Sequence, residues 1–386
     1  MSEQLRTIKQ INERIATGDV VVLTAEELAA AVEEDGLEKT ARRVDVVTTG
    51  TFGPMCSSGA FINFGHATPR LRASKAWLND VPAYAGIAAV DVFIGATELA
   101  EDDPTNKVFP GRFEYGGAHV IHDLLTGKKV TLRAVSYGTD CYPGRSLIKE
   151  LTLDQLPNAW LYNPRNCYQN YPAAVNLSAK TIYTYMGILK PDAGNINFSS
   201  AGALSPMLKD PEYRTIGLGT KIFLGGGVGW VVGHGTQHNP QVERTAGGAP
   251  KNGAGTLALQ GDLKGMSADW LRPTSLLGYG VSMTMGVGIP IPIIDQAICG
   301  QAAATDSELL TQIVDYSEDY PNGQAKDLAE VSYAELYSGQ VEFREKTVPT
   351  ASMSSRPKAR EIAALLKDWI ATGNFTLGEA QQLLPR

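Results

Sequence analysis

Cysteine and long apolar runs are both scarce in this sequence. Four cysteines in 386 residues are too few for a disulfide-stapled secreted domain, so we interpret them as free thiols, metal ligands or nucleophiles. The sequence lacks an apolar run of membrane-spanning length, and its first residues lack the apolar core of a signal peptide. These absences predict a cytoplasmic protein without a membrane partner.

Positive charge is scarce as well. Lys and Arg total 34 against 41 Asp and Glu, so the net charge is −7. This balance argues against a nucleic-acid partner, because nucleic-acid-binding proteins carry a basic face. The glycine-rich segment 225–229 (GGGVG) matches neither the dinucleotide fingerprint nor the P-loop, so a nucleotide site is not predicted.

The patterning predicts an α/β protein with a mixed sheet, in which short strands alternate with glycine-rich loops. Apolar residues at helical spacing predict a helix over residues 4–16, which Gly18 ends. Thr24 and Glu27 form a capping box at the start of a second helix, which Gly36 ends.

The end of the chain is predicted to form a helical hairpin. Residues 362–370 place Ile, Leu and Trp on one helical face, and Thr376 and Glu379 are spaced as the cap of a last short helix. We expect this hairpin to pack on the main body or on a partner subunit.

Three of the four cysteines follow a predicted strand by a few residues. Residues 44–49 read as a strand that the turn 50–54 ends, and Cys56 lies just beyond it. Residues 129–136 precede the loop 137–145 with Cys141, and the apolar run 159–162 precedes Cys167. Ligands of open α/β sheets bind beyond strand ends, so we expect these thiols to converge on one site. The alternative for Cys56 is a small buried side chain that only packs.

Charged neighbours suggest how such a site would work. Arg145 and Arg165 lie close in sequence to Cys141 and Cys167, where either guanidinium could stabilise a thiolate or hold a substrate carboxylate. His119 is a candidate general acid for an oxyanion. Cys299 follows an apolar run and is interpreted as packing.

An iron–sulfur cluster is the alternative use of the three thiols. Clusters are usually held by four cysteines, so Cys56, Cys141 and Cys167 would hold a [4Fe–4S] cluster with one open iron. The close C-x-x-C spacing of many cluster proteins is missing here.

Four long motifs of this chain resemble the homocysteine biosynthesis family. They are TTGTFGPMCSSGAFINFGH (residues 48–66), YGTDCYPGR (137–145), YTYMGILKPDAGNINFSSAG (183–202) and FLGGGVGWVVGHGTQHNP (223–240). The resemblance implies an L-aspartate semialdehyde sulfurtransferase of anaerobic archaea and bacteria, with residues 1–350 as the catalytic domain and residues 351–386 as the hairpin. The implied partners are aspartate semialdehyde, sulfide or another sulfur donor, a small ferredoxin-like electron donor and a second copy in a homo-oligomer.

The resemblance also implies which residues act. The family's essential cysteines match Cys56 and Cys141 by motif, with Cys141 carrying sulfur as a persulfide and Cys56 resolving it, or with these roles exchanged. The substrate that the resemblance implies, an aldehyde amino acid, needs a group that binds its carboxylate and a donor to its oxyanion, and our own candidates are Arg145 or Arg165 for the first and His119 for the second. Two alternatives remain: a sulfur-carrier or iron–sulfur assembly protein without small-molecule turnover, and a thiol acyltransferase that uses Cys and His.

Overall fold

The computed structural model describes residues 4–317 and 327–386. In its largest sheet, neighbouring strands run antiparallel, and several neighbours are far apart in the sequence. In spatial order its strands are β19 (Leu271–Leu276), β20 (Gly280–Gly288), β16 (Lys221–Leu224), β17 (Gly227–His234), β18 (Leu257–Asp262), β10 (Asn158–Asn166), β4 (Gly59–Asn63) and β7 (Asp91–Gly95), with β3 (Thr51–Pro54) paired to β20.

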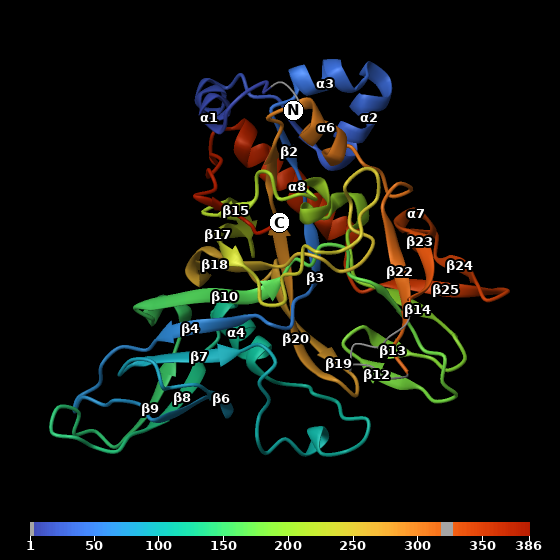
Figure 1. Ribbon diagram of the computed structural model, residues 1–386. Helices are drawn as coiled ribbons and strands as arrows, with labels where there is room; N and C mark the ends of the chain where they lie inside the picture. Colours follow the sequence, from blue (N-terminus) through green and yellow to red (C-terminus); the bar gives the residue numbers. More distant parts are fainter. Residues whose placement is uncertain (1–3, 318–326) are drawn as a thin grey trace.

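A second large sheet contains both parallel and antiparallel pairs, so the predicted mixed α/β class is confirmed. Its strands in order are β23 (Asp327–Ser332), β22 (Leu310–Asp315), β11 (Ala173–Val175), β14 (Ile196–Phe198), β25 (Lys346–Ser352) and β24 (Gln340–Phe343). The two sheets lie side by side in Figure 1, with the second sheet on the right.

Smaller elements surround these sheets. A four-stranded sheet lies below the first sheet in Figure 1. Its strands in spatial order are β6 (Val81–Ala83), β5 (Lys75–Leu78), β8 (Val130–Val135) and β9 (Ser146–Leu151). A three-stranded sheet joins β1 (Val22–Thr24), β2 (Val46–Thr48) and β21 (Pro290–Pro292). Two short pairs are β12 (Ile182–Thr184) with β13 (Gly187–Leu189), and β15 (Gly217–Leu218) with β26 (Gln382–Leu383).

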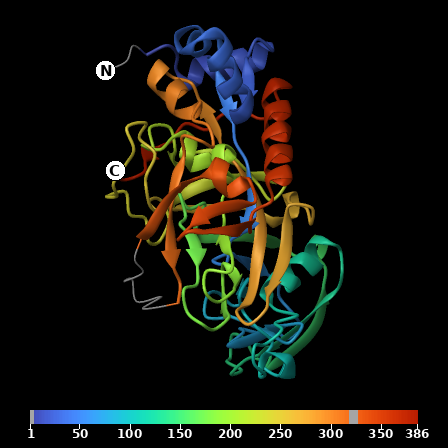
Figure 2. The same cartoon turned by 90° about the vertical axis from the view of Figure 1, so that its right-hand side faces the viewer.

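The helices gather mainly at the end of the molecule that carries the N-terminus, as Figures 1 and 2 show. They are α1 (Ile8–Thr17), α2 (Ala25–Asp35), α3 (Leu37–Arg43), α4 (Gly117–Leu125), α5 (Pro206–Lys209), α6 (Gln296–Ala302), α7 (Tyr333–Tyr337) and α8 (Arg356–Ala371). None of these helices is long and apolar enough to cross a membrane.

The predicted first two helices are confirmed, although α1 begins at Ile8 after an N-cap at Thr7 rather than at residue 4. α1 ends on Gly18 in the left-handed conformation, which glycine adopts without strain. α2 begins with the Thr24–Glu27 capping box, in which each side chain accepts from the other residue's backbone N–H. Both signals act within one turn of chain, so sequence alone reveals them.

Two local predictions are wrong. The turn expected over residues 50–54 contains β3, because Thr51 to Pro54 pair with β20, far away in the sequence. The expected C-terminal hairpin is one helix, α8, followed by an extended chain whose β26 pairs with β15. α8 does pack on the body: Ile362, Leu366 and Ile370 are fully buried in an apolar cluster with residues of α1, β2 and β3.

Candidate functional site

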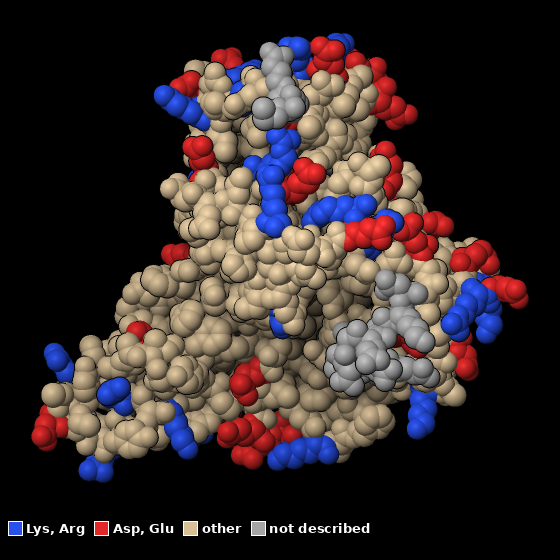
Figure 3. Space-filling model, in the orientation of Figure 1, with Lys and Arg blue, Asp and Glu red and all other residues tan. Residues whose placement is uncertain are grey.

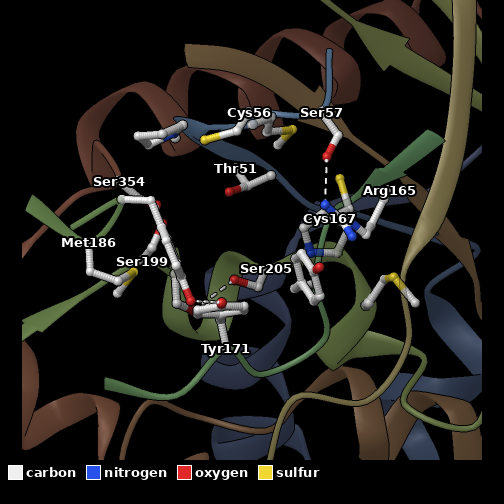
Figure 4. A pocket seen from close by; sticks show the side chains of 18 of the residues that line it. Thr51, Cys56, Ser57, Arg165, Cys167, Tyr171, Met186, Ser199, Ser205 and Ser354 are labelled. Carbon is white, nitrogen blue, oxygen red and sulfur yellow. Dashed lines mark hydrogen bonds between the residues drawn. The ribbon is translucent and has the colours of Figure 1, made fainter. Parts of the chain in front are cut away.

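A cavity of about 390 Å³ lies where β3, the end of β10 and the second sheet meet. Cys56, Ser57 and Arg165 line one side of it, and Figure 4 shows them facing Ser199, Ser205 and Tyr171 across the open space. Among the described residues that line the cavity, none is Asp or Glu. The charge that Arg165 brings therefore makes the cavity suitable for a small anionic ligand.

Cys56 lies on the short loop between β3 and β4 and is partly buried. Burial raises the pKa of its thiol above the ordinary value, because the thiolate loses hydration. Two neighbours oppose that rise in pKa: the buried Ser282 hydroxyl, which donates to Cys56 Sγ at 3.1 Å, and the charge of Arg165. Cys56 is thus a shielded thiol with partners that favour its anion.

Arg165 reaches the cavity because β10 is irregular at its end. The register of β10 against β18 shifts between Asn163 and Asn166, which is a bulge. Bulges turn side chains away from the regular alternation and are common beside active sites. The Arg165 guanidinium donates to Ser57 Oγ at 3.4 Å (Figure 4), beside Cys56.

Asn163 holds together the two segments that form this side of the cavity, and sequence reasoning missed it. This fully buried amide donates from Nδ2 to Ser58 Oγ at 2.9 Å, and its Oδ1 accepts from the backbone N–H of Arg165 at 3.1 Å. Ser58 Oγ in turn donates to the Met55 carbonyl at 2.7 Å. The Cys56 loop and the Arg165 bulge are therefore held by one side chain. The sequence feature that could have drawn attention to Asn163 is the Asn163-Pro164 step, which follows the apolar run 159–162.

Cys167 also lines the cavity, as the predicted convergence requires. Its φ of +52° lies in the left-handed region, which is uncommon for a residue with a side chain. Burial raises the pKa of its thiol to about 12. Cys167 is therefore a neutral thiol at physiological pH and a poor nucleophile.

The far wall of the cavity is built from hydroxyl groups. Ser199 Oγ lies 3.2 Å from Ser354 Oγ, and Ser200 Oγ lies 3.1 Å from Ser205 Oγ. Gly53 of β3 faces Ser354 so closely that a Cβ there would lie 2.5 Å from Ser354 Oγ. Glycine at this position lets the two large sheets approach each other and form the cavity.

Cys141 and Arg145 are not brought to this cavity. Both are exposed on the loop between β8 and β9, where Tyr142 stacks on His66 with ring centroids 6.4 Å apart. Cys56 precedes β4 and His66 follows it, so the two thiols lie at opposite ends of β4. The expected convergence thus holds for Cys56 and Cys167 but is wrong for Cys141 within one chain.

His119 also lies away from the cavity. It is on α4, half-buried, and stacks on Tyr115 with ring centroids 5.3 Å apart. Burial lowers its pKa, so the ring is neutral near pH 7. The predicted role of His119 at the substrate is not supported by this position. Cys299 is fully buried in α6, which confirms that it packs.

The three-cysteine ligand set for an iron–sulfur cluster does not fit this chain. Across residues 4–317 and 327–386, no three His, Cys, Asp or Glu side chains lie close enough together to hold a metal ion. The reason is the position of Cys141, which β4 separates from the other two thiols.

Comparison with known proteins agrees with the resemblance of the motifs. A sequence family described as "Homocysteine biosynthesis enzyme, sulfur-incorporation" matches residues 20–377. A protein of Methanosarcina acetivorans named L-aspartate semialdehyde sulfurtransferase is 47% identical over 384 residues, which cover 99% of this chain and 72% of the relative.

A second relative with the same name, from Methanocaldococcus jannaschii, is 46% identical over 99% of this chain and 74% of its own length. An uncharacterised protein of Methanothermobacter thermautotrophicus is 28% identical over 87% of the chain and 73% of the relative. No solved structure matches significantly. With its match over nearly the whole length and its thiol-lined cavity, this chain belongs to the family of homocysteine biosynthesis enzymes that incorporate sulfur.

Proposed function

We propose that this protein is an L-aspartate semialdehyde sulfurtransferase, which forms L-homocysteine. Two relatives that align with 99% of the chain carry that name. The observation that carries the proposal is a cationic cavity that contains a thiol, Cys56, beside a guanidinium, Arg165. A protein that only carried sulfur or assembled clusters would not need a cavity of about 390 Å³.

Arg165 binds the substrate carboxylate in this proposal. A guanidinium pairs with a carboxylate through two parallel hydrogen bonds, which fixes orientation as well as position. The hydroxyl groups of Ser199, Ser205 and Ser354 on the opposite wall offer hydrogen bonds to the amino group and to the aldehyde oxygen. The aldehyde carbon would then lie near Cys56.

The two thiols have different tasks. Cys141 is exposed, so it can accept sulfur from a donor protein or from polysulfide and hold it as a persulfide. Cys56 then takes this sulfur and presents it to the aldehyde in the cavity. A shielded position for Cys56 protects the reactive sulfur from water and from other thiols.

The overall reaction needs a reductant. One aldehyde, one hydrogen sulfide, two protons and two electrons give one thiol and one water, and sulfur delivered as persulfide requires two further electrons. We assign these electrons to a small ferredoxin-like protein partner. Apart from this reductant, the persulfide route uses only Cys56 and Cys141, and we favour it over a three-cysteine cluster because no three metal-ligating side chains of the described residues lie together.

The test is homocysteine formation from aspartate semialdehyde, polysulfide and a reduced viologen dye. Cys56→Ser should reduce the rate to background while the protein keeps its fold by circular dichroism. Cys299→Ala is the matched control, since that thiol is buried in α6 away from the cavity, and it should keep the activity. Full activity of Cys56→Ser would refute the proposal.

A further inference from the structure

One face of the first sheet is aromatic, and no layer formed by residues 4–317 or 327–386 covers it. Side chains at paired positions of adjacent strands point to the same side of a sheet. The register therefore places six aromatic residues of β7, β4, β10 and β17, with Tyr84 bridged to β7, on one face. These residues, which we term the aromatic face, are Tyr84, Phe93, Phe61, Trp160, Tyr162 and Trp230.

The aromatic face is open to solvent. Its exposed fractions are 65% for Tyr84, 47% for Trp160, 44% for Trp230 and 36% for Phe61. The opposite side of the same strands is buried in the core, and α4 covers it from behind in the view of Figure 1. Figure 3, in the same view, shows a surface over β4 and β10 that is nearly free of charged side chains.

Size and composition match those of a protein interface. The five adjacent strands β7, β4, β10, β18 and β17 contain 5, 5, 9, 6 and 8 residues, which at a rise of ~3.4 Å per residue and a spacing of ~4.8 Å give roughly 540 Å² per copy, or ~1,100 Å² for two. Stable interfaces bury at least about 1,000 Å² in total, and their cores are enriched in Tyr, Trp and Phe. Asp91 and Asp262 also lie on this face, but both are at strand ends. Such a face does not suit a partner that is recognised by charge.

The positions of the two thiols indicate which partner fits. β4 alone rises by about 14 Å, which is far more than the direct contact that sulfur exchange requires. A two-fold axis that lies between the two sheets, parallel to them and perpendicular to β4 at the level of Phe61, lays the same sheet of a second copy antiparallel on the first. Stacked sheets lie ~10 Å apart. This symmetry brings the Cys141 end of one copy over the Cys56 end of the other.

We propose that a second copy of this chain docks on the aromatic face, and that Cys141 of each subunit serves the cavity of its partner. This inference rests on the two-thiol relay of the proposed function. The Cys56 thiolate attacks the outer sulfur of the Cys141 persulfide, and the Cys141 thiolate leaves. One sulfur–sulfur bond forms as another breaks, so the transfer itself requires no oxidant or reductant.

The interface is tested by mass in solution. Sedimentation of the wild-type chain at micromolar concentration should give a dimer, and Trp160→Glu should give a monomer, because it buries a charge in the contact. Leu365→Glu is the matched control: Leu365 is 36% exposed, as Phe61 is, but lies on α8, so this variant should stay dimeric. A monomeric wild type, or a dimeric Trp160→Glu variant, would overturn the docking surface.

The relay between subunits is tested by mixing variants. Cys56→Ser and Cys141→Ser are each expected to be inactive in homocysteine formation. Co-expressed in equal amounts, half of the dimers hold one of each chain and one complete site, which restores about one quarter of wild-type activity. A relay within one chain predicts no recovery, and that result would overturn the inference.

The outcome also separates this inference from the proposed function. If Cys141→Ser alone keeps full activity, the two-thiol relay is wrong, although the dimer stands. If both single variants are inactive and the mixture stays inactive, the relay stands and its path between subunits is wrong.

Discussion

Replacing Ser282 by alanine removes the hydroxyl that donates to Cys56 Sγ at 3.1 Å. Ser282 is fully buried on β20, so the substitution leaves the neighbouring surface and the cavity lining in place. A hydrogen bond to an anion is worth about 1.5–3 kcal/mol and one to a neutral group about 1 kcal/mol, so the thiolate loses roughly 1 kcal/mol relative to the thiol.

This loss raises the pKa of Cys56 further above its ordinary value. Since one pKa unit corresponds to about 1.4 kcal/mol, the thiolate fraction at neutral pH should fall roughly fivefold. Burial already raises the pKa of Cys56, and the hydrogen bond from Ser282 lowers it, so removing this bond can only raise the pKa. The reactivity of Cys56 should therefore shift to more alkaline pH in the variant.

The assay is alkylation by iodoacetamide as a function of pH, read for each cysteine by peptide mass spectrometry. At pH 7 the rate at Cys56 should fall about fivefold in Ser282→Ala, following the thiolate fraction. Cys141, exposed on the β8–β9 loop, serves as the internal standard in the same tube. Ser275→Ala, on the exposed side of the adjacent β19, is the matched control. An unchanged Cys56 profile in Ser282→Ala would refute the reasoning.

Four further predictions concern other side chains of the structure. Arg165→Met should raise KM for the aldehyde 10- to 100-fold, about 1.4–2.7 kcal/mol, while Arg145→Met should leave KM unchanged. Equal effects of the two variants in steady-state kinetics would contradict the binding of the substrate carboxylate by Arg165. Asn163→Ala should lower the free energy of unfolding by about 1–3 kcal/mol in urea titrations, since Ser58 and the Arg165 backbone lose a buried partner. Leu366→Ala should cost about 2–5 kcal/mol by the same measurement, with exposed Leu365→Ala as control. Burial lowers the pKa of Lys209 to about 7, so between about pH 7 and 10 this lysine is protonated in the unfolded chain but not in the folded protein. The free energy of unfolding should therefore rise with pH over this range by up to about 1.4 kcal/mol per pH unit. Lys209→Met should remove this rise, and a variant that keeps it would exclude Lys209 as its source.

The site shows how far local patterns carry a prediction. The residues around Cys56 were identified from a strand, a glycine turn and a thiol, and Cys56 does line a cavity with Arg165. The same pattern around Cys141 predicted the same site, yet Cys141 lies at the other end of β4. Similar local sequence places a thiol on a loop, but the pairing of β4 with β10 and β7 decides where that loop lies.

Asn163 and Ser282 illustrate what the pattern could not reveal. Both act through partners more than 100 residues away: Asn163 contacts Ser58 and Ser282 contacts Cys56. The partner that shows the role of each side chain is supplied by a segment distant in the sequence, so no local pattern could reveal it.

By itself, the sequence determined the family, the α/β class, the capped helices α1 and α2 and the thiol of the cavity, because motifs, caps and apolar spacing act over a few neighbouring residues. Only the tertiary structure decided that β3 pairs with β20, that the chain after α8 is extended, and that β4 separates Cys141 from Cys56. Those features depend on hydrogen bonds between strands far apart in the chain, whose partners no local pattern specifies.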